Sequence, residues 1–223
     1  MEKEHIVGKF DKELDRIKNE ILEMGMLVKK QIQGATKALL SFETKDVDEL
    51  ITTDLKINGM NKTINQHVEQ LIAMRQPMAL DLRSALMATS IAAELERLGD
   101  HAKSTARRVK KLSENSSGED ILNLLGQMSQ IIQEMLTKVL KAYKRVNIKL
   151  AGQIRNRDAD LDKLYKKIQK ESILAIQQNP NDTETLVNFI LLARNFERAG
   201  DHIVNIARQV HQIVTGEDLK ASD

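Results

Sequence analysis

Apolar residues recur every three or four positions along most of the chain. In the first stretch they begin at Val7 and run through Leu14 and Val28 to Phe42. This spacing places apolar side chains on one face of a helix, so it predicts a long amphipathic helix there. By the same criterion we expect five further helices, over about 46–75, 80–112, 121–146, 158–178 and 183–214.

Residues that favour turns and helix ends separate these segments. Asp46, with Glu49 three residues later, has the pattern of an acid-capped helix start, and Pro77 ends the second helix. NPND at 179–182 predicts a turn and a cap, and SENSSGED at 113–120 breaks the periodicity near the middle of the chain. The expected order is three helices, a linker and three more helices.

The two halves of the sequence can be aligned. TDLKINGMNKTI (53–64) matches RDADLDKLYKKI (157–168), and ELERLGDHAKSTARRV (94–109) matches NFERAGDHIVNIARQV (195–210). The spacing between these segments differs only in the intervening loop, as a duplicated unit would allow. We therefore expect an all-α protein made of two tandem antiparallel three-helix bundles, with repeats at 1–115 and 116–223.

Composition narrows the class of protein. Of the 223 residues, 41% are hydrophobic but only 3% aromatic, which favours helices over strands, and there is no cysteine for a disulfide or a thiolate metal site. A net charge of +2 gives no basic field for nucleic acid. The charged N-terminal residues do not resemble a signal peptide, and the longest apolar run, FILLA at 189–193, is too short to cross a bilayer. We expect a soluble protein that does not bind nucleic acid.

The motif ERLGDH at 96–101 is unfavourable for the helix that contains it. Glu96 and Asp100 are like charges four residues apart on one helix face, and Gly99 between them costs about 1 kcal/mol relative to alanine. The second half repeats each of these features, at Glu197, Gly200 and Asp201. A conflict that recurs in register indicates a functional site.

The preceding helix of each half carries a matching pair. Asp158 and Asp162 are again acids four apart, and their first-half counterparts are Asp54 and Asn58. Packing the two helices together would gather oxygen ligands, whose repulsion a divalent cation would turn into attraction. Such ligands suit Mg, Mn, Ca or Fe better than a dedicated zinc site. A similar pair at Asp11 and Asp15 has no counterpart, and we interpret it as solvated surface.

Other polar residues near the motif have less specific roles. His101 and His202 directly follow the acids, and we expect them to support the site or to form buried hydrogen bonds rather than to bind metal directly. Arg97 has Glu94 three residues before it, so we expect a surface ion pair.

The sequence lacks the motifs of several enzyme classes. A ferritin-like di-iron site is excluded because its Glu-x-x-His motif occurs only at Glu2–His5, and no phosphate-binding loop or nucleophile elbow is present.

The segments RQPMALDLRSALMATSIAAELERLGDHAKSTARR (75–108) and ARNFERAGDHIVNIARQV (193–210) resemble the PhoU family of phosphate-transport regulators. The resemblance extends over nearly the whole chain. It implies a twin three-helix bundle that holds divalent or multinuclear metal ions (Fe, Mn, Mg or Zn) on its surface. The ligands that it implies here are Glu96, Asp100, Glu197, Asp201, Asp158, Asp162, Asp54 and Asn58, although the amide of Asn58 departs from the acidic pattern.

The resemblance also implies a role. It is that of a cytoplasmic, non-enzymatic adaptor that represses the phosphate-starvation response by contacting the phosphate transporter's ATPase subunit and a membrane sensor histidine kinase. We expect a homodimer, because long bundles leave apolar side faces to cover. Two alternatives stay open from the residues alone. One is a metal-dependent phosphohydrolase that uses the carboxylate clusters, and the other is a metal-storage protein.

Overall fold

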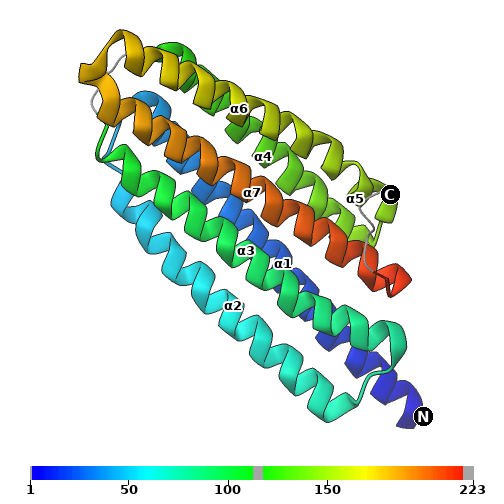
Figure 1. Cartoon of the computed structure of the whole chain (residues 1–223). Helices are drawn as coiled ribbons and strands as arrows, with labels where there is room; N and C mark the ends of the chain where they lie inside the picture. The colour runs from blue at the N-terminus through cyan, green and yellow to red at the C-terminus, as the bar shows by residue number, and fades with distance from the viewer. Residues whose placement is uncertain (1, 113–117, 218–223) are drawn as a thin grey trace.

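The computed structural model describes residues 2–112 and 118–217 and shows a helical rod (Figure 1). Its six long helices are α1 (Glu2–Ser41), α2 (Val47–Arg75), α3 (Ala79–Val109), α4 (Glu119–Arg145), α6 (Ile154–Gln178) and α7 (Thr183–Thr215). A short helix, α5 (Ile148–Gly152), precedes α6, and the 3-10 turn η1 (Pro180–Asp182) precedes α7. No strand occurs within the described ranges, and the predicted all-α class is confirmed.

The helix ends follow most of the predicted signals. Gln76, just before Pro77, adopts a left-handed conformation (φ 49°) and its N–H donates to the Ile72 carbonyl at 3.0 Å, which closes α2. Asp46 does precede α2, but its side chain makes no capping hydrogen bond, so the predicted acid cap is wrong in detail. Residues 113–117 of the predicted linker lie outside the described residues.

The short helix α5 was not predicted. Val146 turns the chain after α4 with a left-handed conformation (φ 50°), and the Asn147 side chain then accepts a hydrogen bond from the Leu150 N–H at 3.0 Å. This N-cap starts α5, and α6 begins at Ile154 rather than at the predicted Asp158. The chain thus changes direction through a capped single turn of helix.

The two repeats lie side by side (Figure 1). Helices α1, α2 and α3 form the first repeat, and α4, α6 and α7 form the second. Equivalent helices meet at the interface, where α3 packs against α7 and α1 packs against α4, while α2 and α6 lie on opposite edges of the rod (Figure 1). The six-helix, two-repeat architecture expected from the sequence is therefore present, with an extensive contact between the repeats.

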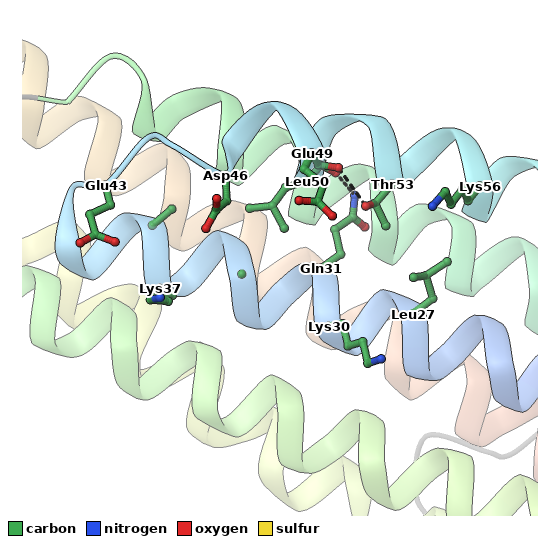
Figure 2. Close-up of a pocket in the computed structure, with 12 residues that line it drawn as sticks. Leu27, Lys30, Gln31, Lys37, Glu43, Asp46, Glu49, Leu50, Thr53 and Lys56 are labelled. Atoms are coloured by element: carbon green, nitrogen blue, oxygen red, sulfur yellow. Dashed lines mark hydrogen bonds between the residues drawn. The ribbon is translucent and has the colours of Figure 1, made fainter.

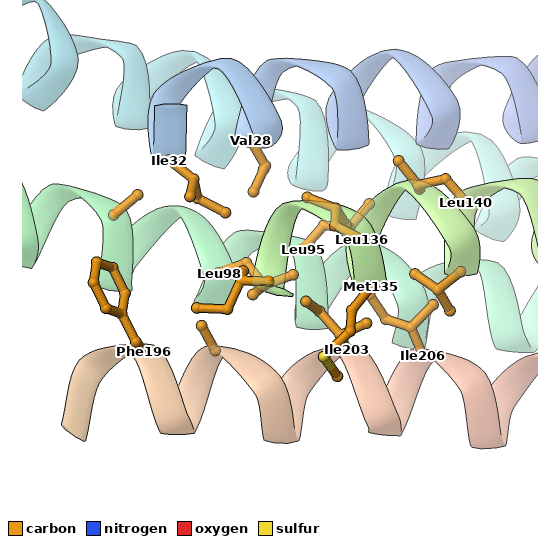
Figure 3. Close-up of a cluster of buried hydrophobic side chains, with 14 of the residues drawn as sticks. Val28, Ile32, Leu95, Leu98, Met135, Leu136, Leu140, Phe196, Ile203 and Ile206 are labelled. Carbon is orange, nitrogen blue, oxygen red and sulfur yellow. The ribbon is translucent and has the colours of Figure 1, made fainter. Parts of the chain in front are cut away.

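The core lies mainly between the four central helices. Figure 3 shows side chains from both repeats interdigitating there, and all belong to one continuous buried cluster: Val28 and Ile32 of α1, Leu95 and Leu98 of α3, Met135, Leu136 and Leu140 of α4, and Phe196, Ile203 and Ile206 of α7. Burying one such aliphatic side chain stabilises the fold by roughly 1.5–3 kcal/mol. The boundary predicted between residues 115 and 116 falls outside the described residues and stays a prediction.

Within residues 2–112 and 118–217, no helix combines the length and the apolar character needed to cross a bilayer.

Candidate metal centres

Two groups of polar side chains occupy equivalent places in the two repeats. The first-repeat cluster comprises Asp54 and Asn58 of α2 with Glu96 and Asp100 of α3. The second-repeat cluster comprises Asp158 and Asp162 of α6 with Glu197 and Asp201 of α7. Each cluster forms because the outer helix of its repeat packs against the helix that carries the glycine-containing motif. The structure thus brings each predicted set of residues to one helix pair.

In the second-repeat cluster the outer helix approaches α7 closely at Gly200. A β-carbon added there would lie 2.7 Å from Asp158 Oδ1 and 2.6 Å from Leu161 Cδ1, so any larger residue would displace one of these side chains. Glycine therefore lets the Asp158 carboxylate lie against the backbone of α7. This contact is the physical reason for a helix-destabilising residue within the motif.

The acids of the second-repeat cluster repel one another. Burial, followed by the charges of Asp201, Asp162 and Glu197, raises the pKa of Asp158 to about 6. Burial and the charges of Asp201 and Asp162 likewise raise the pKa of Glu197. Partial desolvation beside like charges disfavours the ionised form of a carboxyl group.

No basic side chain of the described residues forms an ion pair with Asp158, Asp162, Glu197 or Asp201. The four carboxylates offer only oxygen ligands, the type preferred by Mg²⁺, Mn²⁺ and Fe²⁺. The charge of Arg208 opposes the raised pKa of Asp158, and the charges of Arg194 and Arg198 oppose that of Glu197, but both pKa values stay raised. A divalent cation among the acids would supply the positive charge that these arginines do not. The donor set of the second repeat therefore fits the metal that the sequence predicts.

The first-repeat cluster has a different electrostatic character, because a lysine lies within it. Lys103 Nζ is 2.7 Å from Asp54 Oδ2 and 2.6 Å from Asp100 Oδ1. Asn58 Nδ2 also donates to Asp54 Oδ2 at 3.3 Å. Lys103 was not among the residues predicted from the sequence, although its position three residues after Asp100 could have predicted its pairing with that acid.

Arg97 extends the first-repeat cluster toward solvent. Its guanidinium forms ion pairs with Glu96 at 3.4 Å and Asp100 at 3.6 Å. Arg97 thus forms surface ion pairs as predicted, but not with the predicted partner Glu94, whose carboxylate bonds to His202 of the other repeat. Burial, with the charge of Asp100 next, raises the pKa of Glu96.

The two motif histidines meet where α3 contacts α7. Their ring centroids are 5.3 Å apart, with an interplanar angle of 34°. His202 Nδ1 forms a 2.6 Å hydrogen bond with Glu94 Oε2, which confirms a hydrogen-bonding role for this histidine. Burial, aided by the neighbouring charges of His202 and Arg198, lowers the pKa of His101 to about 4, so His101 is neutral at pH 7.

The side chains as they stand do not form a coordination sphere. Within residues 2–112 and 118–217, no group of three or more His, Cys, Asp or Glu side chains is arranged to hold a metal ion. The eight predicted ligands share the right helix pairs, and their use as ligands stays a prediction.

A separate cleft of about 340 Å³ opens between α1 and α2 near their connecting turn (Figure 2). It is lined by Leu27, Lys30, Gln31, Gly34, Lys37, Ala38, Glu43, Asp46, Glu49, Leu50, Thr53 and Lys56. Gln31 Nε2 donates to the Leu50 carbonyl across it at 2.9 Å. None of the predicted metal ligands lines this cleft, and its acidic and basic side chains give it no single charge preference.

Comparison with known proteins agrees with this architecture. The PhoU domain model matches residues 21–109 and 125–210, one match in each repeat. The chain belongs to the PhoU family. Solved PhoU-family structures share its shape. PhoU from Pseudomonas aeruginosa superimposes with a TM-score of 0.86 at 32% identity, covering 93% of this chain and 100% of that one. The phosphate transport system regulatory protein PhoU from Streptococcus pneumoniae gives a TM-score of 0.88 at 28% identity, covering 95% and 99%.

PhoU-family relatives also match over nearly their whole length. The phosphate-specific transport system accessory protein PhoU homolog of Rhizobium meliloti is 31% identical, with 95% of this chain and 90% of that one covered. The homolog of the same name in Clostridium acetobutylicum is 32% identical, with 96% and 98% covered. The family resemblance identified from the ERxGD motifs is therefore confirmed.

Proposed function

We propose that this protein is an accessory protein of a phosphate-specific transport system that represses phosphate uptake and the phosphate-starvation response. The observation that carries the proposal is the match, over at least nine-tenths of both chains, to relatives named as accessory proteins of that system. The similar protein of Streptococcus pneumoniae is named as a regulatory protein of the phosphate transport system. Those names describe accessory proteins rather than enzymes, and this supports a non-enzymatic role.

The proposed role includes metal binding. The second-repeat cluster offers four carboxylates without an ion-pair partner in the described chain, at least one of them with a strongly raised pKa. A divalent ion such as Mn²⁺ or Fe²⁺ would neutralise this surface of α6 and α7. Neutralising the acids of α6 and α7 removes their repulsion of other acidic protein surfaces, since like-charged surfaces repel. The metal thus makes this face competent to bind a partner.

The proposed partners are the ATPase subunit of the phosphate transporter and a membrane sensor histidine kinase, which place the protein in the cytoplasm. We also propose a homodimer. Apolar side chains exposed at the α2–α3 turn, including Met74, Met78 and Leu80, provide area for such a contact. Light scattering of the purified full chain tests this part, and a single monomeric mass at micromolar concentration contradicts it.

Deleting the gene in its host tests the regulatory role. With phosphate in excess, the deletion strain should take up labelled phosphate faster than wild type and express starvation genes. Restoring the intact gene should reverse both effects. Unchanged uptake and unchanged expression in the deletion strain would refute the proposal. Turnover of phosphate esters by the purified protein with Mn²⁺ would instead favour the hydrolase alternative.

A further inference from the structure

The two clusters differ at two equivalent positions. Lys103 of the first repeat aligns with Val204 of the second, and Asn58 aligns with Asp162. Both differences place a hydrogen-bond donor in the first repeat where the second has an apolar or an accepting side chain. Both donors reach the same atom, Oδ2 of Asp54. The pair of changes therefore acts on one carboxylate.

The ammonium group of Lys103 lies between acids from two helices. It is 2.7 Å from Asp54 Oδ2 on α2 and 2.6 Å from Asp100 Oδ1 on α3, distances typical of charge-assisted hydrogen bonds. The side chains of Asp54, Lys103 and Asp100 are 3%, 19% and 33% exposed, respectively. The lysine thus connects a buried acid to a partly exposed one.

A metal ion bridging these two acids would need the same space. Its ligand oxygens would lie about 2.0–2.6 Å from it, so Lys103 Nζ would first have to leave. Displacement would break both hydrogen bonds of the ammonium and leave two positive centres close together. In the second repeat Val204 is buried and presents no charge, so no such obstacle exists.

Formal charge leads to the same distinction. Counting only the cluster side chains and Lys103, and leaving out the solvent-exposed Arg97, the first-repeat cluster has three carboxylates and one ammonium, a formal charge of −2. The four carboxylates of the second-repeat cluster give −4. One divalent ion in the second-repeat cluster would bring it to −2 as well. Lys103 and the neutral Asn58 together therefore do permanently for one repeat what a single divalent ion would do reversibly for the other.

We propose that the Lys103 ammonium serves as a built-in cation of the first-repeat cluster, so that this chain binds its exchangeable divalent metal at the second-repeat cluster only. The proposal rests on the metal-binding part of the proposed function. It makes the two repeats unequal, since only the face formed by α6 and α7 responds to metal concentration.

Binding of Mn²⁺ to the metal-stripped full-length protein, measured by calorimetry, tests the proposal. Asp201→Asn should lower the Mn²⁺ affinity of the wild type at least tenfold, whereas the matched variant Asp100→Asn should leave it within about twofold. Lys103→Val, which introduces the side chain of the second repeat, should add Mn²⁺ binding that Asp100→Asn then removes.

The outcomes separate the two claims. An equal loss of Mn²⁺ binding in Asp100→Asn and Asp201→Asn would overturn the lysine proposal and leave metal binding intact. Absence of Mn²⁺ binding by wild type and by Lys103→Val would refute the metal-binding function itself. Failure of Lys103→Val to gain binding would show that the ammonium is not what excludes the ion. Circular dichroism checks that Lys103→Val folds, and Lys103→Met replaces it if it does not. Asp100→Asn and Asp201→Asn test the proposal independently, because both keep the lysine in place.

Discussion

The imidazole rings of His101 and His202 lie 5.3 Å apart at the contact between α3 and α7. These residues hold equivalent positions in the two repeats, so equivalent residues of the two repeats meet at this interface. Each follows an acid of its own cluster directly. The two clusters are therefore connected by a direct contact between their neighbouring histidines, in addition to the covalent connection along the chain.

This interface contains a hydrogen bond whose loss should be measurable. Glu94→Gln removes the charge that accepts from His202 Nδ1 at 2.6 Å, so the free energy of unfolding should fall by about 1 kcal/mol. Urea denaturation at pH 7 measures it. The control Glu23→Gln changes an exposed acid of α1 and should shift stability by less than about 0.5 kcal/mol. Equal effects of both variants would contradict a specific role for Glu94.

The shared core predicts that both repeats unfold together. Leu98→Ala deletes a fully buried side chain at the interface and should lower the free energy of unfolding by about 2–5 kcal/mol, with a single transition retained. Calorimetry measures the transition. Leu55→Ala, at a side chain that is 70% exposed, serves as the control and should cost little. Two separate transitions would mean that the repeats are independent domains.

The tight contact at Gly200 predicts an effect on metal binding. In Gly200→Ala the new methyl group would meet Asp158 Oδ1 at 2.7 Å, so the carboxylate must move and Mn²⁺ affinity should fall roughly tenfold. In the matched variant Gly99→Ala the nearest atom is Ile57 Cδ1 at 3.1 Å, and Mn²⁺ affinity should not change. Calorimetric titration of both variants measures the difference. A loss in Gly99→Ala alone would contradict the assignment.

The raised pKa of Asp158 predicts a pH dependence of stability without metal. Its value is about 6 in the fold against 3.8 normally, so the native protein holds this proton more tightly than the unfolded chain does. The stabilisation of the fold that results from this tighter proton binding is complete below about pH 4 and is lost as the pH rises through 6. In EDTA, Asp158→Asn should therefore be more stable than wild type at pH 7, on the order of 1 kcal/mol after solvent screening, and equal to it near pH 4.

Thermal unfolding of both proteins across this pH range measures that effect. Added Mn²⁺ should reverse the order at pH 7, because only the wild type gains from binding. A variant less stable than wild type in EDTA at pH 7 would show that Asp158 is already compensated.

The helices and the repeat were predictable because they depend on local signals. The apolar periodicity of three and four marks every long helix, and Pro77 marks the end of α2. By contrast, α5 is a single turn, too short for periodicity to detect, although the capping residue Asn147 was visible in the sequence. The start of α6 was also misplaced, at Asp158 instead of Ile154, because no side-chain cap marks that helix end.

The members of each cluster were also predictable, since i, i+4 acids must share a helix face. The role of Lys103 was not, because half of it depends on Asp54 from another helix. The partner of Glu94 is even more remote in sequence, at His202. Contacts between repeats depend on how the helices pack against each other, which no local pattern contains.

The most direct test of the central claim is to isolate the tagged protein from its host grown in high phosphate and to identify by mass spectrometry whether the phosphate transporter's ATPase subunit accompanies it. The account predicts that the wild type and Asp100→Asn retain the ATPase, and that a folded Asp201→Asn variant loses it. Absence of the ATPase from the wild-type preparation, under conditions where its own tagged form recovers the rest of the transporter, would contradict the account.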